Sequence, residues 1–82
     1  MNTNELRAVR VSQGKNAAYM SAVIGKTVDN YSKKERGQVK FTPDEISLIT
    51  NDLNLTPAKF NAIFFDSKLP FGKFSGATLS EL

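Results

Sequence analysis

The sequence predicts an all-α fold, and three observations lead to this prediction. No segment alternates apolar and polar residues for long enough to require a β-strand. Apolar residues recur instead at spacings of three and four, as they do on one face of a helix. Residues that typically begin or end helices (Thr, Asn, Pro and Gly) also recur at short intervals between residues 3 and 65. We therefore expect five short helices that fold back on one another into a compact bundle.

The first predicted helix begins at a capping threonine, Thr3, and continues to about Ser12. Leu6 and Val9 share its apolar face, and Gly14 ends it.

The second predicted helix covers residues 17–24, with Asn16 as its cap. Its apolar residues fall at helical spacings, namely Met20, Val23 and Ile24. Gly25 follows directly and can adopt the positive φ that closes a helix.

A third helix is predicted over residues 28–36, between a capping Thr27 and Gly37. This segment is polar and carries a single large apolar residue, Tyr31. Because so polar a segment gains little free energy from burial, its side chains are expected to be held out toward a partner.

The fourth and fifth helices have the strongest start signals in the chain. The sequence TPDE at residues 42–45 combines a capping Thr, a Pro at the first helical position and a Glu at the third, which is the capping-box arrangement. Asn54 can supply a left-handed stop, and TPAK at residues 56–59 repeats the cap and the proline. The predicted buried residues are Ile46, Ile49 and Leu53 in the fourth helix and Phe60, Ile63 and Phe64 in the fifth.

We expect one domain over residues 1–66 and an irregular C-terminal tail over residues 67–82. Proline and two glycines argue against a helix in the tail, yet Phe71 and Phe74 are costly to leave in water. The tail is therefore expected to pack on the core or on a partner subunit.

The composition excludes several classes of function. The 82 residues include no cysteine and no histidine, which removes the commonest general bases, nucleophiles and soft metal ligands. We expect no enzymatic activity, no cofactor, no bound metal and no small-molecule substrate. No run of about 18 apolar residues and no signal peptide is present, so we expect a cytoplasmic protein without membrane contact.

The positive charge lies in the N-terminal half. Residues 1–40 carry eight basic and three acidic side chains, whereas residues 41–82 carry three basic and five acidic ones. This asymmetry within a net charge of +3 favours a polyanionic partner on the N-terminal side.

Residues 17–37 meet the physical requirements of a helix-turn-helix unit. Ser21 is the small residue where the two helices would cross, Gly25 supplies the turn, and Tyr31 anchors the second helix. At about 100° per residue, Glu35 and Thr27 fall near Tyr31 and are expected near the core. The outward face then carries Asp29, Lys33 and Arg36, with Ser32 and Asn30 on its flanks and Val28 on its border.

We expect this outward face to enter the major groove of DNA and to contact base edges. Val28 is suited to a thymine methyl group, Asp29 to a cytosine amino group and Lys33 to guanine acceptors, with Ser32 as a fourth base contact. A DNA site that contains G·C pairs is therefore expected.

Residues 6–64 resemble the lambda-repressor-like DNA-binding domain, the Cro and XRE group of phage and bacterial regulators. The resemblance is carried by LRAVRVSQG (residues 6–14), NAAYMSAVIG (16–25), TVDNYSKKERG (27–37) and LNLT (53–56). Each piece alone is a weak signal, but their joint spacing is a strong one.

The resemblance implies roles for further residues. In similar domains an arginine at the position of Arg10 pairs with a glutamate at the position of Glu35, and this pair joins the first helix to the recognition helix. The start of the second helix and the loop after the recognition helix grip DNA phosphates. The matching phosphate contacts are Lys15, Asn16, the Ala17 amide, Lys26, Thr27, Arg36 and Lys40.

Three positions depart from the family pattern. The family often has glutamine where Ala17 stands, an apolar residue where Lys26 stands and a large apolar residue where Lys34 stands. Without the glutamine one side-chain contact to DNA is lost. Lys34 is expected to lay its methylene groups on the core and to send its amine to solvent.

Together these observations predict a sequence-specific transcriptional regulator, a phage or mobile-element repressor or Cro-like protein, that occupies a palindromic operator as a homodimer. An alternative of another class is a protein-interaction module of the same fold, antirepressor or antitoxin-like. Asp29 and the missing glutamine motivate this alternative.

Overall fold

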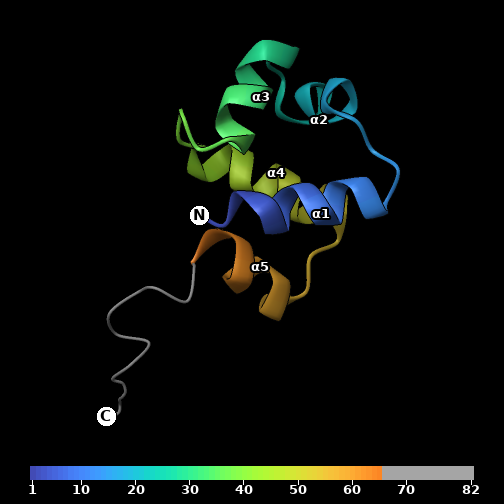
Figure 1. Ribbon diagram of the computed structural model, residues 1–82, viewed down its shortest axis with the longest axis vertical. Helices are drawn as coiled ribbons and strands as arrows, with labels where there is room; N and C mark the ends of the chain where they lie inside the picture. Colours follow the sequence, from blue (N-terminus) through green and yellow to red (C-terminus); the bar gives the residue numbers. More distant parts are fainter. Residues whose placement is uncertain (66–82) are drawn as a thin grey trace.

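The computed structural model describes residues 1–65, and every regular element in this range is an α-helix (Figure 1). The predicted all-α class is therefore confirmed for this part of the chain. The predicted tail, residues 67–82, lies outside the described residues. The helices are α1 (Thr3–Ser12), α2 (Ala17–Ile24), α3 (Val28–Glu35), α4 (Pro43–Leu53) and α5 (Pro57–Phe64).

Helix starts follow the predicted caps with one exception. The side chains of Asn16, Thr27, Thr42 and Thr56 each accept a hydrogen bond from the third amide of the following helix. In α1 the cap is Asn2 and not Thr3, because the Asn2 side chain accepts from the Glu5 amide at 3.1 Å and Thr3 is already helical. The prediction of Thr3 was wrong by one residue, which agrees with the higher rank of asparagine as an N-cap.

Two predicted helix ends have the left-handed backbone conformation. Gly25 after α2 has φ 70°, and Asn54 after α4 has φ 53°. Both residue types tolerate positive φ better than others, and their amides bond back to carbonyls of the last turn. Each stop turns the chain sharply, which brings α3 back across α2 and α5 back toward α1.

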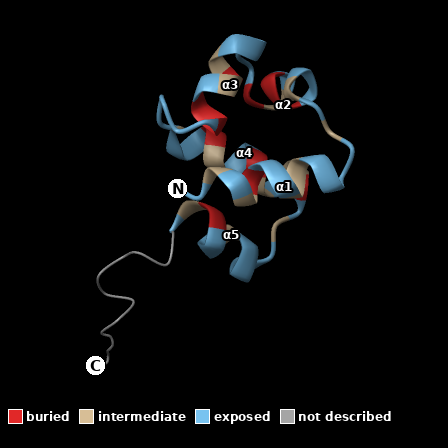
Figure 2. Cartoon of the chain, viewed as in Figure 1, coloured by how far each residue is buried: buried red, intermediate tan, exposed pale blue. Residues whose placement is uncertain are grey.

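The core is built by all five helices, each of which contributes at least one fully buried apolar side chain (Figure 2). In Figure 1, α2 and α3 lie together at one end of the molecule and α5 at the other, and α2 packs on both α3 and α4. Ile46 in α4 and Phe60 and Phe64 in α5 were expected to be buried but are only partly so. Ile63 is the one fully buried apolar side chain of α5. The core residues are Leu6, Met20, Ile24, Tyr31, Ile49, Leu53 and Ile63.

A buried ion pair links α3 to α4. The Lys34 amine donates to both carboxylate oxygens of Glu45 at 2.7 Å, and the two side chains are only 6 % and 5 % exposed. The expectation that the Lys34 amine reaches solvent was therefore wrong. Glu45 was expected to do little beyond capping α4, but besides accepting from the Thr42 amide at 2.9 Å it neutralises this lysine.

The Glu45 carboxyl group is held in its charged form. Burial by itself would raise its pKa, but the hydrogen bonds from Lys34 and from the Thr42 amide, with the lysine charge, outweigh burial and lower the pKa. The capping box and the ion pair thus share one carboxylate.

None of the helices within residues 1–65 combines the length and the apolar character that a membrane-spanning helix needs.

Candidate nucleic-acid interface

The α2–α3 unit has the internal packing that the sequence predicted. Ser21 is buried where α2 and α3 cross. Its hydroxyl donates to the Ala18 carbonyl at 2.7 Å and therefore has a hydrogen-bond partner despite its burial. Tyr31 is fully buried, and its ring lies 6.0 Å from that of Phe41. Because Tyr31 fixes the inner side of α3, the rotation of the helix about its own axis is set.

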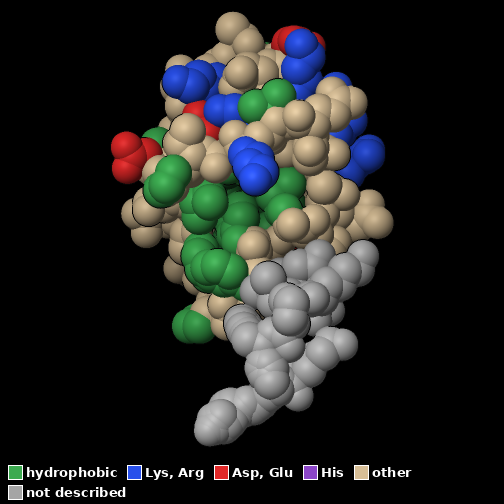
Figure 3. All heavy atoms as spheres, turned by 90° about the vertical axis from the view of Figure 1, so that its left-hand side faces the viewer, with side chains coloured by type: hydrophobic (Ala, Val, Ile, Leu, Met, Phe, Trp, Pro, Cys, Tyr) green, Lys and Arg blue, Asp and Glu red, His purple; other side chains and the backbone are tan. Residues whose placement is uncertain are grey.

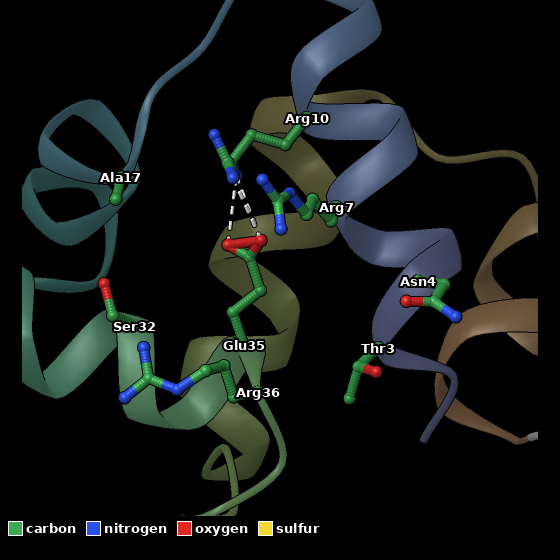
Figure 4. A pocket seen from close by; sticks show the side chains of 8 residues that line it. All are labelled: Thr3, Asn4, Arg7, Arg10, Ala17, Ser32, Glu35 and Arg36. Carbon is green, nitrogen blue, oxygen red and sulfur yellow. Dashed lines mark hydrogen bonds and ion pairs between the residues drawn. The ribbon is translucent and has the colours of Figure 1, made fainter.

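The structural pair between α1 and α3 is present. Arg10 Nε lies 3.0 and 3.2 Å from the two Glu35 carboxylate oxygens, and Nη2 lies 3.1 Å from one of them (Figure 4). The remaining nitrogen, Nη1, donates to the Lys15 carbonyl at 2.9 Å. One guanidinium therefore joins α1, the loop before α2 and the end of α3. The buried Tyr31 hydroxyl lies close to this pair, and burial followed by the Glu35 charge raises the pKa of Tyr31.

The outer face of α3 presents the expected polar groups. Val28, Asp29, Lys33 and Arg36 are exposed, and Ser32 is half-buried beside them. Lys33 Nζ lies 3.1 Å from Asp29 Oδ2, so two predicted base contacts form an ion pair one helical turn apart. Thr27, expected near the core, is exposed instead because it is the cap and lies outside the helix.

The predicted phosphate contacts separate into three groups. Asn16, Lys26 and Thr27 are exposed at the start of α2 and in the turn before α3. The Ala17 side chain and Arg36 line one cleft. Lys40 is exposed but lines another hollow, next to Val39 and Phe41.

Lys15 does not join these groups. Its amine bonds to the Asp52 carboxylate at 3.1 Å and to the Asp52 carbonyl at 2.9 Å, and it is therefore turned toward the end of α4. Its partner is 37 residues away in the sequence, so no local pattern could have indicated this contact. The predicted phosphate contact by Lys15 is at odds with this geometry.

A polar cleft of about 200 Å³ lies between α1, the start of α2 and α3 (Figure 4). It is lined by three arginines and one glutamate, and Arg10 already neutralises that glutamate. Arg7 makes no ion pair within residues 1–65, and Arg36 reaches only the Gln38 side chain, at 3.5 Å. The cleft is therefore electropositive. The full lining is Thr3, Asn4, Arg7, Arg10, Ala17, Ser32, Glu35 and Arg36.

Arg7 is the residue of this cleft that sequence reasoning missed. It stands three positions before Arg10, so both face the same side of α1, and this spacing could have indicated it. In Figure 4 its guanidinium points toward the Glu35 carboxylate from the side opposite α2.

An apolar face lies over the loop before α4 and over α5. Met1, Val39 and Phe65 are 40 %, 41 % and 51 % exposed there. The ring of Phe64 lies 6.3 Å from Phe41 and 5.3 Å from Phe60, so partly buried aromatic rings continue the same surface. Figure 3 shows hydrophobic side chains gathered on this side of the molecule, below several basic groups. We call this surface, comprising Met1, Val39, Phe41, Phe60, Phe64 and Phe65, the α5 face.

The arrangement places a polar helix surface beside an electropositive cleft, which suits a ligand with regularly spaced negative charges and hydrogen-bonding edges. Comparisons of the chain with family models, with curated proteins and with solved structures found no match.

Proposed function

We propose that the chain is a helix-turn-helix protein that binds double-stranded DNA, with α3 as its recognition helix. The observation that carries this proposal is the orientation of α3. Tyr31 points inward, while Val28, Asp29, Ser32 and Lys33 lie on the side away from the core or at its border. A helix fits the major groove, and these side chains include an apolar group, an acceptor and two donors for base edges.

Within this class we infer a lambda-repressor-like regulator of the phage or prophage type, a repressor or Cro-like protein that works in the cytoplasm by occupying its operator. The Arg10–Glu35 pair at 3.0 Å and the left-handed Gly25 between α2 and α3 support this narrower assignment, because both are features of the family that the sequence resembles. Occupancy of a promoter needs no cofactor and no chemical step.

Contacts between the protein and the phosphate backbone of DNA would fix the position of α3 in the major groove. Arg36 and Arg7 border the cleft beside the recognition face, and Lys26 is exposed in the turn before α3. The first residues of α2, beginning at the half-buried Ala17, offer backbone amides to a phosphate near the same cleft.

Titration with duplex DNA at several salt concentrations tests the proposal. We expect binding whose affinity falls steeply with salt, because cationic contacts release counterions from DNA. On duplexes that the wild type retains from a random pool, Lys33→Ala should weaken binding by roughly tenfold or more, since a good base contact contributes about 1–3 kcal/mol.

Lys59→Ala is the matched control for Lys33→Ala. It removes the same charge from α5, where Lys59 pairs with Glu5 at the other end of the molecule from α3. Equal effects of the two substitutions would mean that only net charge matters. Absence of any salt-dependent binding by the wild type would contradict the proposal and favour a protein-interaction module that uses the α5 face.

We also propose that DNA is bound by a homodimer, because one domain with so few base contacts binds weakly alone. The two recognition helices would then lie about 34 Å apart on a two-fold site. The α5 face supports self-association, since three of its residues leave large apolar side chains substantially exposed.

Sedimentation of the full chain and of a chain truncated after Asp66 measures this association. We expect the full chain to form a dimer whose fraction rises with protein concentration. Truncation should weaken this dimer if residues 67–82 take part in it. A mass that stays monomeric up to about 0.1 mM, with and without DNA, would contradict the dimer; an unchanged dimer after truncation would assign it to residues 1–66 alone.

A further inference from the structure

We propose that the Asp29–Lys33 ion pair is a specificity filter that admits a G·C base pair and disfavours other DNA. This inference rests on the proposed function and adds the kind of base pair that the site prefers. The pair lies on the exposed side of α3, with 3.1 Å between Lys33 Nζ and Asp29 Oδ2. The aspartate side chain is 76 % exposed and the lysine 47 %, so both can meet a ligand without moving the helix.

The charge of Asp29 has no evident structural purpose beyond a small local one. An aspartate in the first turn of a helix, paired one turn later with a lysine, stabilises the helix by a few tenths of a kcal/mol. Against DNA the same carboxylate is unfavourable, because it opposes the phosphates and neutralises the amine that would attract them. A surface that only needed to hold DNA would gain affinity by losing it.

The carboxylate becomes favourable where a base edge supplies a donor. In the major groove a G·C pair presents two acceptors, O6 and N7, on guanine and an amino donor, N4, on cytosine. An amine over the guanine and a carboxylate over the cytosine satisfy all of these groups together. At an A·T pair in the same pose, the amine keeps only adenine N7 as an acceptor and meets the adenine amino group where guanine has O6, while the carboxylate meets thymine O4, another acceptor. The amine then loses one of its two acceptors, and the carboxylate loses its donor.

The pair therefore acts in two ways. On DNA without the matching base pair, Lys33 remains bound to Asp29, and the recognition face gains little from its positive charge. On the matching pair, both groups exchange their mutual contact for contacts with bases. Asp29 thus lowers affinity for random DNA and raises the ratio between specific and non-specific binding, which decides occupancy when competing sites are in excess.

Asp29→Asn tests this inference, because it keeps the shape of the side chain and removes its charge. The probe is a pool of random duplexes of roughly 20 base pairs, two helical turns, sequenced before and after retention on the protein. We expect Asp29→Asn to bind the unselected pool roughly three- to tenfold more tightly at low salt. We also expect the retained sequences to lose a G·C preference that the wild type shows, with a roughly tenfold loss in the specificity ratio.

Asp44→Asn is the matched control. Asp44 is also the second residue of its helix and is exposed, so the substitution changes net charge and the helix terminus in the same way, but on α4. It should leave both the unselected affinity and the base preference unchanged. Thermal unfolding of both variants checks that neither effect arises from a loss of folded protein.

The outcomes separate this inference from the proposed function. Suppose that the wild-type protein binds DNA and that Lys33→Ala weakens this binding, but that Asp29→Asn leaves the specificity ratio unchanged. That result would overturn the specificity filter and leave the proposed function intact. Equal effects of Asp29→Asn and Asp44→Asn would also overturn it, since charge alone would then explain the result. A wild-type protein that does not bind DNA would contradict both the specificity filter and the proposed function.

Discussion

Replacing Lys34 by methionine is expected to lower the free energy of unfolding by about 3–5 kcal/mol, because it leaves the buried Glu45 carboxylate without its partner. Methionine resembles lysine in length and flexibility, so the packing of the methylene groups is largely kept. A domain of this size is stable by only about 3–10 kcal/mol, so much of the variant is expected to unfold. Urea unfolding followed by circular dichroism measures the change.

The double variant Lys34→Met/Glu45→Gln is the control for this loss. Glutamine keeps the capping box with Thr42 but carries no charge, so most of the stability should return. A double variant as unstable as Lys34→Met alone would show that the lost lysine contacts, rather than the unpaired charge, cause the effect.

The pH dependence gives the single variant a distinct signature. In the wild type the folded-state pKa of Glu45 is lowered, so its contribution to stability is present above about pH 5 and is lost as the pH falls through the folded-state pKa. Without Lys34, burial is the dominant effect and raises that pKa, so acidification from neutral pH should stabilise Lys34→Met. Stability that falls with acid equally in both proteins would contradict the pairing as the source of the effect.

Replacing Arg10 by methionine is expected to cost about 3 kcal/mol of stability and to reduce DNA affinity in whatever fraction remains folded. Glu35 is 9 % exposed in its side chain and would keep its charge with no partner, and the Lys15 carbonyl would lose a donor. Since the guanidinium joins α1, the loop before α2 and α3, the cleft and the recognition face would also lose their fixed relation.

Arg7→Met is the matched comparison, since it makes the same chemical change one helical turn earlier in the same cleft. Arg7 makes no ion pair within residues 1–65, so its stability change should stay within about 0.5 kcal/mol. If it contacts a phosphate, the slope of log affinity against log salt should fall by about 1. Equal destabilisation by Arg7→Met and Arg10→Met would contradict the special role of the Arg10–Glu35 pair.

The helices were predictable because their signals are local. Thr42, Pro43 and Glu45 lie within four consecutive positions, and each acts on backbone groups only a few bonds away. The same is true of Gly25 and Asn54, whose positive φ values follow from their own residue types. The inward direction of Tyr31 followed from its being the single large apolar residue in α3, and the helical repeat then fixed where Asp29 and Lys33 lie.

The errors at Lys34 and Lys15 concern side chains whose partners come from another helix. Lys34 meets Glu45 across 11 residues and Lys15 meets Asp52 across 37, and neither spacing belongs to a helix or turn pattern. Lysine was expected to reach solvent because an unpaired buried amine is costly, but that cost disappears when a carboxylate is buried beside it. The Arg10–Glu35 contact, 25 residues apart, was equally non-local and was found only through the family resemblance.

The guanidinium of Arg10, held between Glu35 and the Lys15 carbonyl, has a consequence for the kinetics of binding. It links α1 and α3 to the segment before α2 in the unliganded chain, so under the proposed function a DNA duplex would meet a recognition helix that is already in its binding position. Little conformational entropy then remains to be lost on complex formation. Encounter with DNA should accordingly be limited by diffusion and long-range attraction rather than by rearrangement of the protein.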